Sequence, residues 1–449
     1  MRSLIRRSAF SLGALLAVVA ESDARAAQKP PAAPVSNPAA LHAAIDKAAD
    51  AILPKVVAWR RDFHEHPELG NSEVRTSKIV ADELKALGFE VKTGVAKTGV
   101  VGLLRGGKPG PVVALRSDMD GLPVAEEVDL PFKSKATAQW AGQQTGVMHA
   151  CGHDNHLAIL LGTAHVLAEL KPQLAGSVKF IFQPAEEGPP PGEEAGAALM
   201  VKEGVLENPK VDAIFGLHVF PYETGTLAWR SRGIMAAGDT IEIVVKGRQT
   251  HGAQPWAGVD PIVVGSQIVL GLQTLVSRQV DLTVAPAIVT IGAFNGGNRH
   301  NIIPNEVKMI GTLRTYDKGM REVLMERIRR TASLIAQSAG ATAEVSFGQG
   351  LPVTYNDPAL TSRMDATLRR VGGSKVLPDV SPSTTSEDFS FFQEKVPGVF
   401  FFLGVTPKGT AAADIYANHS PRFFADEAAL ITGVRAMSNM AVDYLTPRN

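Results

Sequence analysis

The feature that most constrains the fold is the alternation of short apolar runs with helical patterns along most of the chain. Apolar runs of strand length occupy 89–92, 100–104, 112–115, 178–182 and 213–217. Segments with helical periodicity occupy 45–61, 73–87 and 155–170. Strands that alternate with helices form layered α/β domains. We therefore predict an α/β fold. Pro54 should start the helix at 45–61 late or kink it, and Asp154 should cap the helix at 155–170.

The order of elements changes near residue 238. A strand, a helix, two strands, a helix and a strand follow at 241–245, 261–277, 288–291, 307–313, 318–338 and 343–347. This order is typical of a ferredoxin-like unit. The α/β pattern then resumes with 358–371, 399–403 and 426–444. We predict a larger domain in two parts, 41–237 and 351–449, with an α+β domain inserted at 238–350.

The N-terminal region differs from the rest of the chain. Three arginines, Arg2, Arg6 and Arg7, come first. An apolar run follows at 9–20, and small residues follow at 24–27. This order predicts a signal peptide over 1–27 and hence a periplasmic or secreted protein. A Pro/Ala-rich lead-in over 28–40 comes next. An uncleaved anchor is the alternative, although the apolar run is short for a bilayer span. The export route stays open, because Arg6-Arg7 fits a twin-arginine signal only in part.

Charge and cysteine content narrow the function. Lys+Arg and Asp+Glu are both 45, so the formal net charge is zero. This balance argues against nucleic acid or an anionic membrane surface as the partner. Cys151 is the one cysteine in 449 residues, so the chain makes no internal disulfide. The thiol therefore needs another explanation.

Thiol, imidazole and carboxylate groups gather in short segments. These are RSDMDG at 116–121, MHACGHD at 148–154, QPAEEG at 183–188, GLHV at 216–219 and NHSP at 418–421. The first, third and fourth follow predicted strands, whose C-terminal ends face one crevice in an open sheet. Such groups suit a borderline-soft divalent ion such as zinc. Of the adjacent Glu186 and Glu187, one can bind metal while the other accepts a proton from water.

None of these motifs is decisive by itself. A lone cysteine such as Cys151 is commonly a small buried hydrophobe, and a Glu-Glu pair is commonly solvated. His149 and His156 are best interpreted as supporting or core histidines. The ordered set of motifs carries the prediction.

In that order, the motifs resemble the M20 metallopeptidase clan, and most of all its amidohydrolase branch of hippurate and indole-acetyl-amino-acid hydrolases. The resemblance covers residue 56 to the C-terminus. It implies two divalent metal ions per subunit (zinc, manganese or cobalt), with the ligands Cys151, His153, Glu187, His218 and His419. It also implies that Glu186 is the general base and that Asp120, behind the ligands, orients them.

The resemblance makes the inserted domain a dimerisation or lid domain. His251, in THGAQP, matches a histidine that stabilises the oxyanion, either within a subunit or from a partner. Asn301 and Arg314 match positions that grip the carboxylate of the substrate. The segment TSEDF at 385–389 matches one that lies near the substrate. A homodimer or larger homo-oligomer is therefore expected.

The implied activity is hydrolysis of the amide bond of an N-acyl amino acid or a similar small amide. A dipeptidase or aminopeptidase on the same fold is the alternative. An inactive binding protein is a further one, but it would usually have lost the base or a ligand. Four departures from the family pattern leave the substrate open: Asn155, Thr250, a segment at 135–145 that looks longer than typical, and a Pro-rich loop, GPPPGEE, at 188–194.

Overall fold

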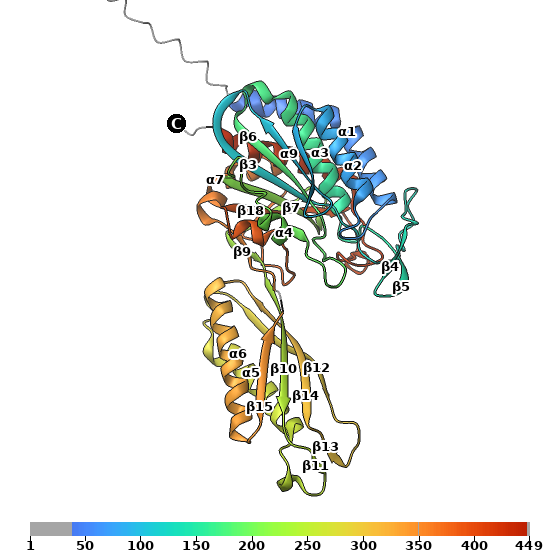
Figure 1. The fold of residues 1–449 in the computed structure, drawn as a ribbon. Helices are drawn as coiled ribbons and strands as arrows, with labels where there is room; N and C mark the ends of the chain where they lie inside the picture. Colours follow the sequence, from blue (N-terminus) through green and yellow to red (C-terminus); the bar gives the residue numbers. More distant parts are fainter. Residues whose placement is uncertain (1–37, 349, 447–449) are drawn as a thin grey trace, which may run out of the picture. The chain divides into compact units, whose positions relative to one another are not determined.

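An eight-stranded mixed sheet is the largest sheet of the computed structural model, which describes residues 38–348 and 350–446 (Figure 1). In spatial order its strands are β1 (Glu90–Val95), β2 (Gly99–Arg105), β6 (Ala175–Gln183), β3 (Lys108–Asp118), β7 (Ala213–Glu223), β18 (Gly398–Thr406), β8 (Leu227–Trp229) and β17 (Val376–Pro378). The central strands β6, β3, β7 and β18 run parallel. Their C-terminal ends therefore meet at one edge. The predicted signal peptide lies outside the described residues.

Helices and short strands form a core on each face of this sheet. The first core contains α1 (Pro38–Glu65), α2 (Val74–Ala86), α3 (His153–Glu169), α7 (Pro358–Gly372) and α9 (Leu430–Leu445). The second contains residues of α4 (Gly196–Lys202), α8 (Ser390–Gln393) and β9 (Arg232–Met235), the last of which pairs with β16 (Thr354–Asn356). Among the described residues, no helix combines the length and apolarity that a membrane span needs.

Consecutive phenylalanines in β18 show how the sheet separates the two cores. Phe401 packs into the first core, whereas Phe400 and Phe402 pack into the second. All three side chains are fully buried. Successive side chains of a strand point to opposite faces, so an uninterrupted apolar run is what a strand covered on both faces requires.

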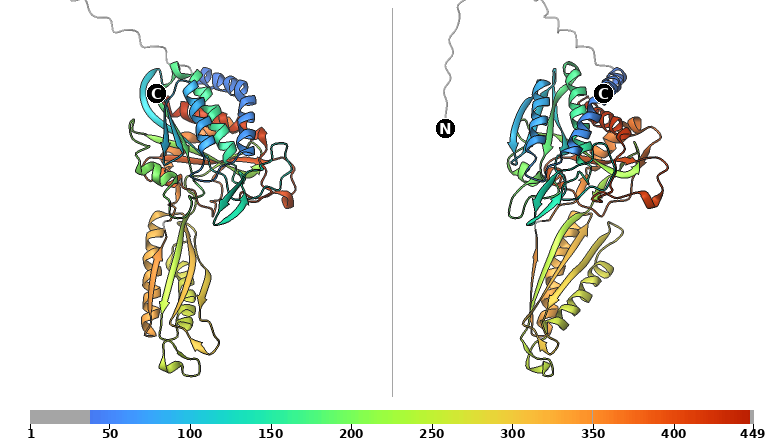
Figure 2. Two further views of the ribbon diagram at one scale, coloured as in Figure 1. Left: turned by 45° about the vertical axis from the view of Figure 1, so that its right-hand side comes forward. Right: turned by 90° about the vertical axis from the view of Figure 1, so that its right-hand side faces the viewer.

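A four-stranded antiparallel sheet forms between Ala237 and Phe347. Its spatial order is β12 (Ala287–Gly296), β14 (Glu306–Thr315), β10 (Ala237–Lys246) and β15 (Thr342–Phe347). The helices α5 (Pro261–Gln279) and α6 (Lys318–Ser338) pack on one face of it (Figure 2). The chain order is β10-α5-β12-β14-α6-β15, so the predicted α/β fold with an inserted ferredoxin-like unit is confirmed.

Besides the β9–β16 pair, two further strand pairs lie outside these sheets and were not predicted from the sequence. One is β4 (Thr137–Trp140) with β5 (Gln143–Gly146), and the other is β11 (Thr250–His251) with β13 (Ile302–Ile303). The first falls in the segment that looks long for the family. The second carries His251.

Three local predictions were wrong. The late start of the first helix was wrong, because α1 begins at Pro38 and continues through Pro54, with buried residues on both sides, such as Ile45 and Val56, packed against the core. The cap of α3 is Gly152, and Asp154 lies inside the helix with its carboxylate against buried Arg60, at 3.0 Å.

The third error concerns β7. The strand continues to Glu223, so His218 lies within it and does not follow it. The alternation of β7 directs Leu217 and Val219 into the first core and the imidazole of His218 to the opposite face, near Phe220 and Phe400.

Phe401→Ala is expected to lower the free energy of unfolding by about 3–5 kcal/mol, since it removes a fully buried aromatic side chain from the first core. Urea denaturation followed by circular dichroism measures the change. Phe424→Ala is the matched control, because that side chain is 38% exposed and its loss should cost well under half as much. Equal effects in the two variants would contradict this description of the core.

Candidate functional site

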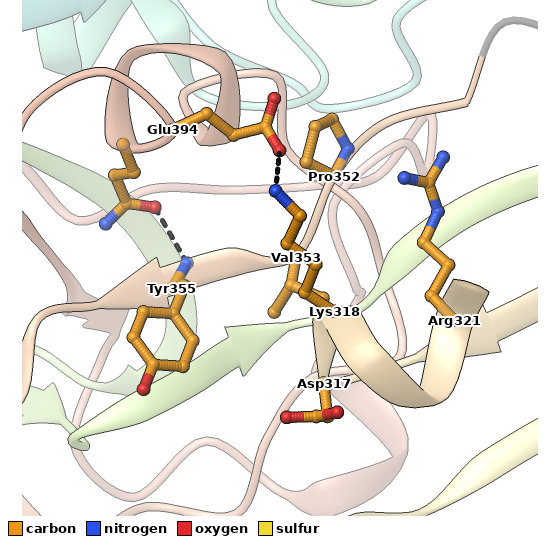
Figure 3. Close-up of a pocket in the computed structure, with 8 residues that line it drawn as sticks. Asp317, Lys318, Arg321, Pro352, Val353, Tyr355 and Glu394 are labelled. Carbon is orange, nitrogen blue, oxygen red and sulfur yellow. Dashed lines mark hydrogen bonds and ion pairs between the residues drawn. The ribbon is translucent and has the colours of Figure 1, made fainter. Parts of the chain in front are cut away.

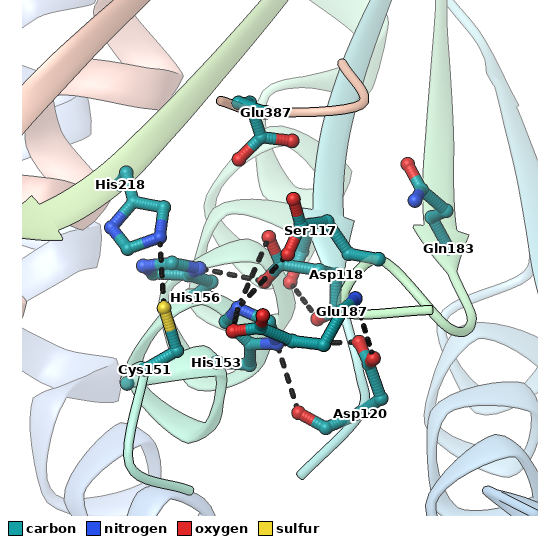
Figure 4. A network of polar contacts seen from close by, with 12 residues as sticks. Ser117, Asp118, Asp120, Cys151, His153, His156, Gln183, Glu187, His218 and Glu387 are labelled. Atoms are coloured by element: carbon teal, nitrogen blue, oxygen red, sulfur yellow. Dashed lines mark hydrogen bonds and ion pairs between the residues drawn. The ribbon is translucent and has the colours of Figure 1, made fainter. Parts of the chain in front are cut away.

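The motif residues converge where the parallel strands end and α3 begins (Figure 4). Asp118 is the last residue of β3, and Glu187 follows β6. His218 projects from β7, while Cys151 and His153 flank the start of α3. Residues that are distant in sequence therefore share one small volume.

A tight turn brings Cys151 and His153 together. Gly152 between them has φ +92°, and a Cβ atom there would lie 2.3 Å from Cγ2 of Val219. Only glycine combines this conformation with such a close approach. The backbone N–H of His419 donates to the carbonyl of Ala150 at 2.8 Å, which brings the C-terminal motif to the same turn.

The loop that carries the two glutamates is held from behind. Ala185, with φ +48°, precedes Glu186 in a conformation that non-glycine residues rarely adopt. Its N–H donates to Oε1 of the buried Glu73 at 2.8 Å. This hydrogen bond stabilises a strained backbone next to the candidate base.

Cys151 lies at the centre of the donor atoms. Its Sγ is 3.3 Å from Nε2 of both His218 and His419. Nε2 of His419 is also 2.9 Å from Oε1 of Glu187. The donors form two groups that share the thiol, one with His153 and His218 and the other with Glu187 and His419. Two neighbouring cations could therefore share a single thiolate.

Backbone carbonyls orient the ligand histidines. Nδ1 of His153 donates to the carbonyl of Asp120 at 2.8 Å, and Nδ1 of His218 donates to that of Val219 at 2.7 Å. Both Nε2 atoms are then free to coordinate. Oδ2 of Asp120 accepts the N–H of Glu187 at 2.9 Å, and its Oδ1 lies 3.3 Å from Nδ1 of His153, so this carboxylate contacts two ligand residues without lying among the shared-thiol groups.

The electrostatics of these groups fit a bound cation. Burial lowers the pKa of His153, but Asp118 and Asp120 outweigh it and raise the pKa to about 10. Burial, and then Glu187, raise the pKa of the Cys151 thiol well above its usual value. Nε2 of His153 has no hydrogen-bond partner among the described residues. A nearby divalent ion would balance the excess of carboxylates and favour the thiolate, and sulfur, nitrogen and oxygen donors suit zinc or a similar ion.

Glu186 occupies a different position from Glu187. Its Oε2 lies 3.9 Å from Nε2 of His153, and its carboxylate adjoins those of Glu387 and Asp388. Burial and the negative charge of Glu387 raise the pKa of Glu186 well above its usual range. A raised pKa suits a group that must accept and later release a proton near neutral pH.

Arg116 was not recognised from the sequence. Its buried guanidinium donates to Asp118 at 2.7 Å, to Glu387 at 2.9 Å and to Asp388 at 3.0 Å. Its Nε donates to Gln183 at 2.8 Å. The available signal was a charged residue within an otherwise apolar strand, which buries an ion only when partners are present.

The histidines interpreted as supporting residues are buried. Nδ1 of His156 contacts Oδ1 of Asp118 at 2.6 Å, and its Nε2 accepts the N–H of Val219 at 2.8 Å. His156 therefore braces β3 and β7 from α3. His149 is 1% exposed, and burial lowers its pKa to about 4.

The remaining predicted residues, Arg314, His251 and Asn301, lie far apart within the inserted domain. Arg314 pairs with Gly238 at one end of the β10–β14 ladder, next to Ser386. His251 and Asn301 lie beyond the opposite end, where His251 pairs with Ile302 and the N–H of Gly252 donates to the carbonyl of Asn301 at 2.8 Å. The ladder between Gly238 and Lys246 is about 26 Å long at ~3.3 Å per residue. One chain therefore does not bring all three to one small substrate.

Two cavities of the protein differ in whether residues of the metal-donor groups line them. One, of 460 Å³, is lined by Glu186 and Glu187. Another, of 310 Å³, lies at the start of α6 (Figure 3). In the latter, Lys318 faces Glu394 at 3.7 Å and Arg321 pairs with Asp239 at 2.6 Å, and none of its described lining residues belongs to a group of side chains that could hold a metal ion. The donor groups identify the first cavity as the candidate active site.

Residues 114–443 match the model of peptidase family M20/M25/M40. The chain belongs to this family. It is 41% identical to thermostable carboxypeptidase 1 of Saccharolobus solfataricus, over 87% of this chain and 95% of that protein. It is 38% identical to N-acetylcysteine deacetylase of Bacillus subtilis, over 86% and 96%.

A solved structure shows the same fold. It is the YXEP protein of Bacillus subtilis, described as a dinuclear metal binding peptidase of the M20 family. Its TM-score is 0.74 at 36% identity, covering 88% of this chain and 99% of that one. The predicted family is thus confirmed.

Cys151→Ala is expected to lower the occupancy of both metal positions, because both donor groups contain this thiol. His218→Ala belongs to one group and should lower mainly one. Elemental analysis after reconstitution, reported as ions per subunit, distinguishes the two outcomes. Full occupancy in Cys151→Ala would exclude the thiol as a ligand. Cys151→Ser is a poorer test, since a hydroxyl can still coordinate weakly.

Proposed function

We propose that this protein hydrolyses the amide bond of N-acyl amino acids or similar small amides that carry a carboxylate, with two divalent metal ions per subunit. The observation that carries the proposal is the position of Glu186 beside two donor groups that share Cys151. The metal-binding description of the YXEP protein and the name of the deacetylase support it.

The residues of the chain divide the work. Cys151, His153, Glu187, His218 and His419 hold the two ions, which would polarise the substrate carbonyl and lower the pKa of an attacking water when bound. Glu186 accepts the proton of that water and returns it to the leaving nitrogen. Asp120 fixes the orientation of His153 and the backbone of Glu187. Arg116 keeps Glu387 and Asp388 in place behind the base.

The second candidate is a carboxypeptidase or dipeptidase activity. The 41% identity to thermostable carboxypeptidase 1 of Saccharolobus solfataricus supports this candidate. Arg314, beside the 385–389 segment, suits a free carboxylate in either class of substrate. Hydrolysis of matched N-acetyl and dipeptide substrates by metal-reconstituted enzyme separates the two candidates.

The site is proposed to be completed by a second copy of the chain. The position of His251 and Asn301, about 26 Å or more along the β10–β14 ladder from Arg314, supports their supply by a partner subunit. The four-stranded sheet unit also exposes large apolar side chains, which suits an interface: Trp256, Val263, Leu270, Leu282, Val284, Ile288 and Leu334.

Export is also proposed. The arginines before the apolar run at 9–20 and the small residues at 24–27 support a signal peptide, and a periplasmic or secreted location follows. N-terminal sequencing of the protein recovered from the periplasm tests the cleavage site.

Glu186→Gln is expected to keep its metal content and lose about 10²–10⁴-fold in kcat, because a neutral amide cannot accept the proton. Stopped or continuous assays with an N-acyl amino acid and elemental analysis give both quantities. A loss below tenfold at unchanged metal content would show that Glu186 is not the base.

Mixing inactive His251→Ala and Glu186→Gln subunits is expected to restore activity, to about a quarter of the wild-type value for random dimers with composite sites. Each hybrid then holds one site with Glu186 from one subunit and His251 from the other. Subunit exchange is verified with differently tagged chains. No recovery despite exchange would reject donation by a partner, and unchanged kcat in His251→Ala would reject any role in the oxyanion step.

A further inference from the structure

A second cavity shares the Pro-rich loop with the active-site cavity. Gly188 and Pro189 line the cavity that contains Glu186, whereas Pro190 and Pro191 line a cavity of 410 Å³. We name the latter the proline cavity. Its volume lies in the range of small-molecule pockets.

Two of the departures from the family pattern, the segment at 135–145 and the Pro-rich loop at 188–194, meet at the proline cavity. The β4–β5 hairpin, seen in Figure 1, forms one wall, and the Pro-rich loop forms another. The lining residues are Pro67, Glu68, Leu69, Gly70, Ser72, Thr137, Ala138, Gln139, Trp140, Ala141, Val147, Pro190 and Pro191. Proline rings and the half-buried indole of Trp140 provide stiff apolar surfaces.

The proline cavity offers no partner for a charged ligand. Of its described lining residues, none is Lys, Arg or His. The carboxylate of Glu68 accepts the backbone N–H of Arg75 at 3.0 Å and of Thr76 at 2.8 Å, so its charge is already engaged. A substrate carboxylate would be left unpaired here, whereas a neutral apolar group would not.

The walls of the proline cavity are continuous with the catalytic residues. The carbonyl of Glu68 accepts the N–H of Gly121, next to Asp120, at 2.7 Å. Gly70 packs so closely that a Cβ atom there would lie 2.7 Å from the carbonyl oxygen of Gly188, directly after Glu187.

The loop is also anchored at its far end. Nδ2 of Asn71 donates to Glu193 at 2.8 Å, and Lys97 pairs with the same carboxylate. Lys202 pairs with Glu194 at 2.8 Å. These contacts, all at the surface, connect the C-terminal end of the Pro-rich loop to Asn71, Lys97 and α4.

We propose that the proline cavity receives the acyl group of the substrate and that the enzyme prefers large apolar acyl groups to acetyl. This inference rests on the proposed amidohydrolase function. The carboxylate of the amino-acid portion needs a cation such as Arg314, so the neutral cavity takes the opposite side of the scissile bond. An acetyl group is too small to use it.

The test compares N-acetyl-, N-octanoyl- and N-dodecanoylglycine with metal-reconstituted wild-type enzyme. We expect kcat/KM to rise at least about tenfold from the acetyl to the dodecanoyl substrate, given the hydrophobic gain of burying several methylenes. Trp140→Ala should remove most of this rise and leave the acetyl substrate within about twofold. Gln144→Ala, on the same hairpin but outside the cavity lining, should behave as wild type.

A filling variant guards against a simple loss of structure. Ala138→Phe should also lower kcat/KM for the dodecanoyl substrate while the acetyl substrate is still cleaved. Replacing glycine by leucine in the substrate should leave the effect of Trp140→Ala unchanged, because the cavity contacts the acyl group. An effect that follows the amino-acid side chain would overturn the assignment, as would a wild-type enzyme indifferent to acyl length.

Binding separates the failure of this inference from the failure of the proposed function. Calorimetry gives the Kd of N-dodecanoylglycine for Glu186→Gln and for Glu186→Gln/Trp140→Ala. A Kd at least about tenfold weaker in the double variant supports the cavity even if no acyl-glycine is hydrolysed, in which case the proposed activity falls. Equal Kd values would overturn the proline cavity as the acyl site.

Discussion

The candidate site depends on holding several carboxylates close together, although their negative charges repel one another. Five carboxylates, those of Asp118, Glu186, Glu187, Glu387 and Asp388, gather around one strand edge. The guanidinium of Arg116 neutralises part of that charge, and bound cations would neutralise more of it. Burial and the carboxylates of Glu387 and Glu187 raise the pKa of Glu186, whereas Arg116 opposes that rise. The affinity of Glu186 for a proton therefore depends on its burial and on the charges around it.

The fold was largely predictable because its signals are local. Apolar runs such as 399–403 and helical periodicity such as 318–338 identify elements from neighbouring residues alone. The errors arose where distant residues decide. Asp154 has the side chain of a helix cap, but Arg60, nearly a hundred residues earlier, holds it inside the helix. Pro54 is tolerated because the core on both sides outweighs the loss of one backbone hydrogen bond.

The site was predictable in composition but not in arrangement. Motifs such as CGHD and EEG identify donor types, and the resemblance supplies their roles. Nothing in the local sequence shows that Cys151 lies within 3.3 Å of both His218 and His419. Nor does it show that Arg314 and His251 lie at opposite ends of one strand ladder. Such distances follow from strand pairing, which joins residues far apart in the chain.

The length of the β10–β14 ladder fixes the distance between Arg314 and the β11–β13 tip. Its length sets how far the β11–β13 tip stands from the 385–389 segment of the same chain, while none of its central side chains contacts the donor cluster. Adding two residues to each strand would preserve the inward and outward alternation of side chains, yet shift the tip by about 7 Å. Substitutions in the middle of this ladder therefore leave the position of the tip unchanged as long as the apolar face is kept, whereas insertions move the tip. Selection would then preserve a count of residues more strictly than their identities.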